Sequence, residues 1–242
     1  MVQPLAVSTS TTVQVPPFAR SCQAAHLLSR VLRHADDSDA DIEFRGEEAV
    51  QLHRTVNALL STALHESDVA IERISDPTRC IALFTSIGLC LSALFVLHNK
   101  YSCIEHASET ETGNSRFQEM HMIAVSGIKD VSELVYRFSE RIRAVAELGG
   151  ILKTTPLIGD CLFQAVGSYL WYMHETGSQE CAPMATSIKD ILRKLGARWK
   201  APSKHRGHIQ SACLAQGMNS NVVLGEYILL LETYESFAGL SI

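Results

Sequence analysis

The chain lacks any close pair of cysteines. Its seven cysteines stand singly along 242 residues, and the Cys-x-x-Cys spacing occurs nowhere. A binuclear zinc cluster needs six thiolates from two arms of that kind, so the spacing excludes one. An odd number of scattered cysteines also argues against a disulfide framework. We therefore expect reduced, mostly buried thiols, as in an intracellular protein.

Charge is scarce as well. Only 19% of the residues are Asp, Glu, Lys or Arg, and the formal net charge is -5. Surfaces that bind phosphate backbones usually carry a clear basic excess. The composition therefore argues against direct nucleic-acid binding. Residues 1–17 lack a basic segment followed by an apolar core, which argues against a secretory signal. They form a stretch rich in Ser, Thr, Val and Pro, and this composition predicts a flexible N-terminal tail.

The motifs of common catalytic sites are missing too. The sequence has no Gly-x-Ser-x-Gly elbow, no Gly-x-Gly-x-x-Gly after a strand pattern and no Gly-x-x-x-x-Gly-Lys phosphate loop. One Ser-x-x-Lys pattern joins Ser126 to Lys129, which could take the serine proton, but its usual supporting motifs are absent. We predict that the chain is not an enzyme, and catalysis by this pair is the enzymatic alternative.

Residues that bind metals are not clustered in the sequence. Two pairs stand one helical turn apart, Cys103 with His106 and His205 with His208. Two ligands do not complete a metal site. No carboxylate accompanies the other histidines in a recognisable pattern, and these include His53, His98 and His174. We predict no metal and no other cofactor.

Strand patterns are absent from the sequence. No segment alternates polar and apolar residues around a hairpin turn, so nothing indicates a sheet. Apolar residues recur instead at helical spacing in several segments. We predict an all-α fold, an irregular bundle of about seven or eight helices forming a single domain over residues 18–242. Its stripes of apolar side chains should bury one another.

One apolar run is long enough to cross a membrane. Residues 80–97 are 18 consecutive uncharged residues, the lower limit for a spanning helix. Thr85, Ser86, Gly88 and Ser92 dilute the run, and no cluster of Lys and Arg flanks it. We predict the central buried helix of the bundle, with a membrane span as the alternative.

Apolar stripes and capping residues predict the individual helices. The first stripe consists of Phe18, Cys22, Ala25, Leu28 and Leu32, others span residues 52–64 and 184–195, and the last spans residues 223–234. Predicted helix starts are Asp76 with Pro77, Asp130 with Glu133, and Thr155 with Pro156. Predicted helix ends are Gly149, Gly177 and Gly196. Residues 105–116 are polar and turn-rich, and we expect a mobile loop there.

Short motifs follow one another in a distinctive order. They are Phe18 to Leu28, Arg30 to His34, Tyr101 to Cys103, Thr155-Pro156, Asp160 to Ala165, Arg198-Trp199 and Gly225 to Glu232. This order resembles the helical C-terminal regulatory region of fungal zinc-cluster transcription factors, over about residues 18–199 and 222–235. The zinc-bound DNA-binding head of that family is missing here. In the family, the Arg-Trp motif leads almost directly to Gly-Glu-Tyr, so we interpret residues 201–223 as a disordered insert, either a surface loop or an intron read in frame.

The resemblance implies a nuclear regulator of transcription by RNA polymerase II. It would act through protein partners, self-association or a small-molecule effector, without touching DNA itself. The residues alone are equally compatible with a helical protein-interaction or small-molecule-sensing module that has no transcriptional role and lies in the cytoplasm. Candidate regulatory contacts are Asp160, Trp199, Glu226 and Tyr227. Each also has a structural interpretation, such as a helix-start carboxylate for Asp160 and buried area for Trp199.

Overall fold

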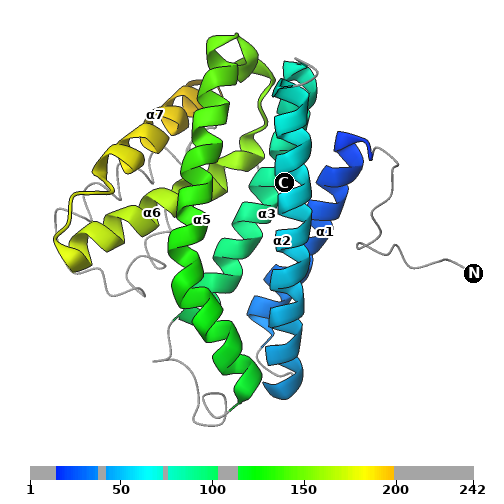
Figure 1. Ribbon diagram of the computed structural model, residues 1–242, viewed down its shortest axis with the longest axis vertical. Coiled ribbons are helices and arrows are strands. Elements are labelled where there is room, and N and C mark those ends of the chain that lie inside the picture. The colour runs from blue at the N-terminus through cyan, green and yellow to red at the C-terminus, as the bar shows by residue number, and fades with distance from the viewer. Residues whose placement is uncertain (1–14, 38–41, 73–75, 103–113, 199–242) are drawn as a thin grey trace, which may run out of the picture. The chain divides into compact units, whose positions relative to one another are not determined.

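The structure is a computed structural model that describes residues 15–37, 42–72, 76–102 and 114–198. Within these residues 91% are helical and no strand occurs, which confirms the all-α prediction. The α-helices are α1 (Pro17–Asp36), α2 (Ile42–Glu72), α3 (Pro77–Ser102), α5 (Ser115–Glu147), α6 (Gly159–Thr176) and α7 (Ala182–Arg198) (Figure 1). Two short 3-10 helices, η1 (Gly150–Lys153) and η2 (Pro156–Ile158), lie between α5 and α6.

The expected count of seven or eight helices is not confirmed, because the described residues hold 6 α-helices. The last predicted helix, residues 223–234, lies outside them, as do residues 1–14, residues 105–113 and the insert 201–223. The chain divides into two compact units, residues 1–128 and 129–242, with the boundary inside α5. The single domain over residues 18–242 stays a prediction.

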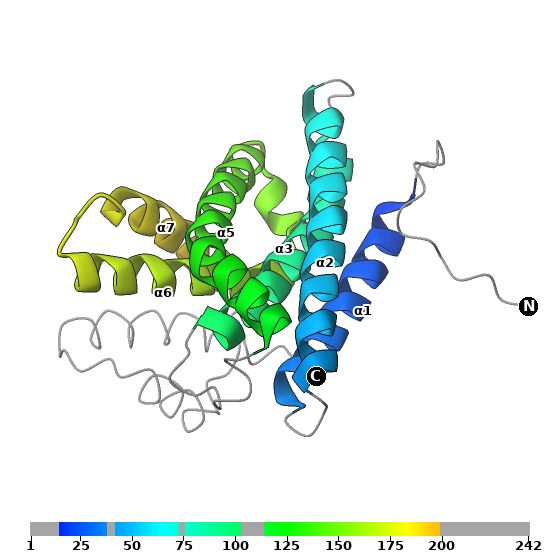
Figure 2. The same cartoon turned by 60° about the horizontal axis from the view of Figure 1, so that its bottom comes forward.

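The first unit is organised around α3, which packs against both α1 and α2 (Figure 2). By length and composition α3 could cross a membrane, but 83% of its most apolar 18-residue window is buried in the protein. Burial of that extent is typical of a core helix. Its fully buried large side chains include Phe84, Leu91 and Phe95. The structure thus contains the buried helix that the sequence predicts.

In the second unit α6 packs against α7. The buried residues recur at the spacing that the sequence predicts, with Leu162, Val166 and Tyr169 on α6 and Ile188, Ile191 and Leu195 on α7. Most of the stability of an amphipathic helix comes from covering its apolar stripe by tertiary packing. The mutual packing of α6 and α7 supplies that cover.

Several predicted helix boundaries are correct. The Asp76 carboxylate accepts hydrogen bonds from the backbone N–H groups of Thr78 and Arg79, at 3.0 and 3.1 Å, so it caps α3. The Thr155 hydroxyl accepts one from Leu157 at 3.2 Å and opens η2, which leads directly into α6. At the other ends, Gly149 and Gly177 have φ of 78° and 67°, a left-handed conformation that favours glycine.

The predicted helix start at Asp130 is wrong. Helix α5 begins at Ser115, capped by the Asn114 side chain, which accepts from the N–H groups of Arg116 and Phe117 at 2.9 and 3.1 Å. Asp130 lies inside this helix, and Glu133 pairs with Arg137 one turn further on rather than with a capping group. An acidic residue three positions before another is common on any solvated helix face, so the pattern alone did not define a start.

Two further boundaries also differ from the predictions. Ser115 and Arg116, assigned by sequence to the mobile loop 105–116, belong to the first turn of α5. Helix α7 continues through Gly196 to Arg198, and Gly196 is buried within it. A buried glycine inside a helix permits close approach of a neighbouring element, so it is not by itself a stop signal.

Helix α1 buries a different face from the one that the predicted stripe indicates. Its buried residues are Ala24, Leu27, Val31 and His34. In the predicted stripe, Phe18, Cys22, Ala25 and Leu32 are exposed and Leu28 is half-buried. Helix α1 therefore has two apolar faces, and periodicity could not decide which one packs on α2 and α3.

Candidate functional site

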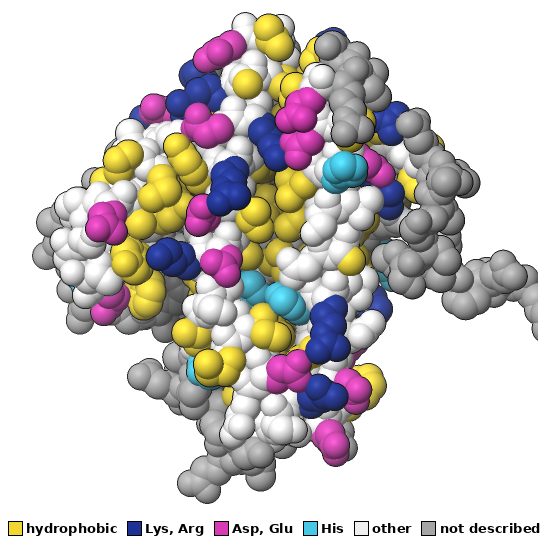
Figure 3. Space-filling model, in the orientation of Figure 1, with side chains coloured by type: hydrophobic (Ala, Val, Ile, Leu, Met, Phe, Trp, Pro, Cys, Tyr) yellow, Lys and Arg dark blue, Asp and Glu magenta, His cyan; other side chains and the backbone are white. Residues whose placement is uncertain are grey.

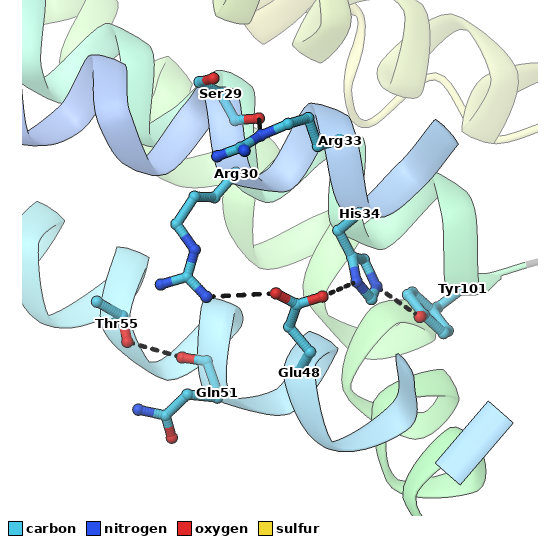
Figure 4. A network of polar contacts seen from close by, with 8 residues as sticks. All are labelled: Ser29, Arg30, Arg33, His34, Glu48, Gln51, Thr55 and Tyr101. Atoms are coloured by element: carbon cyan, nitrogen blue, oxygen red, sulfur yellow. Dashed lines mark hydrogen bonds and ion pairs between the residues drawn. The ribbon is translucent and has the colours of Figure 1, made fainter. Parts of the chain in front are cut away.

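One polar cluster of the first unit centres on His34 (Figure 4). This side chain from α1 is almost fully buried. Its Nδ1 atom lies 2.9 Å from a carboxylate oxygen of Glu48 on α2, and its Nε2 atom lies 2.7 Å from the hydroxyl of Tyr101 on α3. Arg30 donates to the other Glu48 oxygen at 3.3 Å. One imidazole thus connects three helices.

The protonation of this cluster follows from its geometry. Burial by itself would raise the pKa of Glu48, but hydrogen bonds from His34 and Arg30 outweigh it and hold that pKa below its usual value. An ionised carboxylate can only accept, so Nδ1 of His34 carries the proton. In the neutral imidazole, Nε2 then accepts from the Tyr101 hydroxyl.

A carboxylate, an imidazole and a hydroxyl in this order could in principle relay a proton, as in nucleophilic catalysis. Here the hydroxyl is enclosed. Tyr101 is 1% exposed, its ring packs against Phe117 with centroids 5.4 Å apart, and its backbone carbonyl accepts from His121 at 2.7 Å. A nucleophile must be reachable by its substrate, so the geometry assigns this cluster to holding the helices in register.

A second histidine cluster joins α2, α3 and α5. The rings of His53 and His98 are tilted against each other, with centroids 5.4 Å apart. His98 is 1% exposed, and neither of its ring nitrogens has a well-formed hydrogen bond in the described part of the chain. The ring lies directly on Gly127, where a Cβ atom would approach its Cε1 to 2.4 Å. Any other residue at this position would force the His98 ring or the helix to shift.

Burial sets the charge of this pair. It lowers the pKa of His98 to about 4, with the neighbouring His53 as a smaller cause and a weak backbone contact at Gly127 opposing the shift. Burial, followed by the nearby Arg54 cation, also lowers the pKa of His53. Both imidazoles are therefore neutral near pH 7. No group of three or more metal-type ligands occurs among the described residues, so the pair lacks the partners of a complete metal site.

In the second unit, Ser187 on α7 bridges two side chains of α5. Its hydroxyl donates to Glu140 at 2.7 Å, while Arg143 donates to the Ser187 backbone carbonyl at 3.1 Å. Arg143 also contacts the hydroxyl itself. Every group in this cluster is only partly buried, and each has its partner. We interpret this cluster as a polar contact that links α5 to α7.

Of the four candidate regulatory contacts that the sequence indicates, Asp160 is the one within the described residues. Asp160 lies in the first turn of α6, where the helix dipole favours a carboxylate. The neighbouring Cys161 thiol has a pKa raised well above its usual value, chiefly by burial and further by Asp160. Trp199, Glu226 and Tyr227 lie outside the described residues.

The Ser126–Lys129 pair lies on an exposed stretch of α5. The Ser126 hydroxyl donates to the backbone carbonyl of Met122 at 3.0 Å, a common arrangement for serine within a helix. Nothing in the described residues encloses this serine as a catalytic pocket would. The structure therefore adds no support for the enzymatic alternative.

Surface features complete the description. On the face shown in Figure 3, acidic and basic side chains are interspersed, with no broad field of one sign. Large apolar side chains also reach the surface, and the most exposed are Phe18 at 79% and Leu148 at 77%. Phe18 differs from the others because it continues into the exposed apolar stripe of α1. We call this set, Phe18, Cys22, Ala25 and Leu32, the outer stripe.

Comparison with known proteins adds no further identification. No family model, curated protein or solved structure matches this chain.

Proposed function

We propose that this chain is the regulatory region of a fungal zinc-cluster type transcription factor, and that it acts through protein contacts. The motif order from Phe18 to Glu232 supports the family. The outer stripe of α1 supports the mode of action, because a helix that buries one apolar face and exposes another offers a surface for a partner. The motif order is the single observation that carries the transcriptional role, and the exposed stripe supports only the mode of action.

The internal chemistry is consistent with a scaffold that presents surfaces. The buried polar side chains His34 and Tyr101 connect helices, and both lie below 5% exposure. A catalytic group needs access to substrate, whereas a group that fixes helix register does not. In this proposal the chain has no reaction centre, binds no cofactor, makes no direct contact with DNA and works in the nucleus.

A reporter assay tests the proposal. The full chain is fused to an unrelated DNA-binding domain, and transcription from a matching promoter is measured in a fungal cell. We expect the fusion to raise or lower transcription relative to the DNA-binding domain alone, and a fluorescent fusion of the full chain to concentrate in the nucleus. A fusion without effect on the reporter would contradict the proposal and favour an interaction or sensing module with no transcriptional role.

A further inference from the structure

The outer stripe of α1 lies opposite the face that packs on the core. Each residue advances an α-helix by about 100°. On this basis Phe18, Cys22, Ala25 and Leu32 centre roughly 160° away from the buried set that includes Leu27 and Val31. Their spacing of four, three and seven positions is the spacing at which one helix contacts another along its length. The stripe is therefore a helix-binding pattern without a helix on it among the described residues.

The charges beside the stripe indicate what would bind. One edge carries His26, Arg30 and Arg33, of which His26 and Arg33 are exposed. Arg30 pairs with Glu48, yet its side chain remains 40% exposed. The only acidic residue of α1 is Asp36, its last residue. From His26 to Arg33 this edge of α1 therefore carries a histidine and two arginines, and it complements acidic side chains there.

A second copy of the chain fits this surface poorly. In an antiparallel helix pair each edge meets the same edge of the other helix, which would place Arg30 and Arg33 against a basic edge. The exposed face of one helix also offers much less than the roughly 800 Å² per partner that a stable dimer usually buries. A short amphipathic helix needs less area, because two or three apolar anchors and complementary flanking charges suffice for a transient contact.

We propose that the outer stripe binds an amphipathic helix of another protein, one whose apolar stripe is flanked by Asp or Glu. Phe18 and Leu32 are the apolar anchors at the two ends of the stripe. Cys22 and Ala25 between them are small, which lets the partner helix approach closely. Arg33, with the partly exposed Arg30 on the same edge, selects acidic flanks. This inference rests on the proposed function, since it names the partner through which the regulatory region would act.

A peptide titration tests the proposal directly. The probes are two synthetic amphipathic helices with leucines at i, i+3, i+4 and i+7, one with Glu at the flanking positions and its twin with Lys. Fluorescence anisotropy with the full chain at low salt should show about tenfold or tighter binding of the Glu peptide than of the Lys twin. The double variant Phe18→Ser/Leu32→Ser should weaken Glu-peptide binding by about tenfold or more. Arg33→Glu should remove the preference for the Glu peptide.

Matched controls come from the second unit. Trp171→Ser removes another large apolar side chain that is 50% exposed, and Arg193→Glu reverses another exposed arginine. Neither should change peptide binding. All five altered residues are exposed, so circular dichroism should show unchanged helix content in every variant.

The outcomes separate this inference from the proposed function. Equal binding of both peptides, or binding unaffected by Phe18→Ser/Leu32→Ser, overturns the inference even where the reporter fusion is active. Loss of a dimer in the double variant, without peptide binding by the native chain, assigns the stripe to a second copy and also overturns it. Selective binding of the Glu peptide by a chain whose fusion has no reporter effect supports the surface and rejects the transcriptional role.

Discussion

At the scale of single residues, the surroundings of His98 depart from what its chemistry prefers. It is 1% exposed, lies against another histidine and has no well-formed hydrogen bond among the described residues. A buried imidazole in such a place is stable only while neutral. The cost of protonating it makes the fold sensitive to acid.

The pH dependence of stability should reflect His98. In the unfolded chain its pKa is near 6.5, and in the folded protein it is about 4. Between these values the unfolded state binds a proton that the folded state does not, so stability is full above pH 6.5 and falls as the pH drops toward 4. The shift corresponds to about 3 kcal/mol. Urea unfolding at several pH values from 7 to 5 measures the slope.

The control for this prediction is a histidine at the surface. His98→Gln cannot titrate and should reduce the slope between pH 6.5 and 5, whatever its effect on absolute stability. The slope that remains comes from His53, whose pKa burial also lowers. His174→Gln, at a side chain 47% exposed, should leave the slope unchanged. Staying above pH 5 keeps the titration of Glu48, whose pKa lies below its usual value, out of the comparison. A native protein with no slope in this interval would contradict the prediction.

Tyr101→Phe isolates the hydrogen bond at the other histidine cluster. The phenyl ring can keep its contacts with His34 and Phe117, but Nε2 of His34 is left buried without its donor. We expect a loss of about 1–3 kcal/mol in the free energy of unfolding, measured by urea denaturation. Tyr172→Phe, at a half-exposed tyrosine of α6, should change it by less than about 0.5 kcal/mol. Equal effects of the two substitutions would refute the role given to the Tyr101 hydroxyl.

At the scale of helices, α5 shows what a local signal can and cannot define. Asn114 and Asp130 are both residue types that cap helices, and each stands before a helical pattern. Only Asn114 lies at a real helix start, because its side chain accepts from two free backbone N–H groups. Inside a helix those N–H groups already have partners, so Asp130 has none to satisfy.

Substitution of these two residues distinguishes their roles. Asn114→Ala should cost about 1 kcal/mol in the free energy of unfolding, since two N–H groups at the start of α5 lose their acceptor. Asp130→Ala should be nearly neutral, or slightly stabilising because alanine has the higher helix propensity. Thermal or urea unfolding of both variants measures the difference. The reverse order of effects would restore the start at Asp130 and contradict the boundary in the structure.

The face by which α1 packs on the core is a second feature that the sequence did not define. Both of its stripes have helical spacing, and the outer stripe contains the larger residues Phe18 and Leu32. The structure buries the stripe with Ala24 and Val31, where small side chains allow close packing on α3, and where His34 finds Glu48 and Tyr101. A polar residue in phase with Ala24, Leu27 and Val31 was the available signal for this face. Its partners lie 14 and 67 positions away, so one sequence could not identify them.

At the scale of the whole molecule, the pattern of apolar residues correctly predicted the fold class and the buried helix α3. Both features depend on many apolar residues together and not on any single contact. The histidine clusters were not predicted, since each depends on contacts between different helices. Contacts of this kind can be recognised only once the tertiary packing is known. The motif order that resembles a transcription factor region remains the only guide to function, and its C-terminal members Trp199, Glu226 and Tyr227 lie outside the described residues.

Cooperativity of unfolding tests the predicted single domain. Cys90 in the first unit and Cys161 in the second are both fully or almost fully buried, and burial raises the thiol pKa of Cys90 to about 12 and that of Cys161 well above its usual value. Both thiols should therefore resist alkylation until their own unit unfolds.

Because α5 is continuous through the boundary between the units, unfolding either one disrupts a helix that belongs to both. Pulsed alkylation over a urea series, with mass spectrometry of each cysteine peptide, should give coincident midpoints for the two thiols, while exposed Cys22 is labelled throughout. Midpoints that differ by more than the error of the measurement would show two independently unfolding units and would refute the single domain.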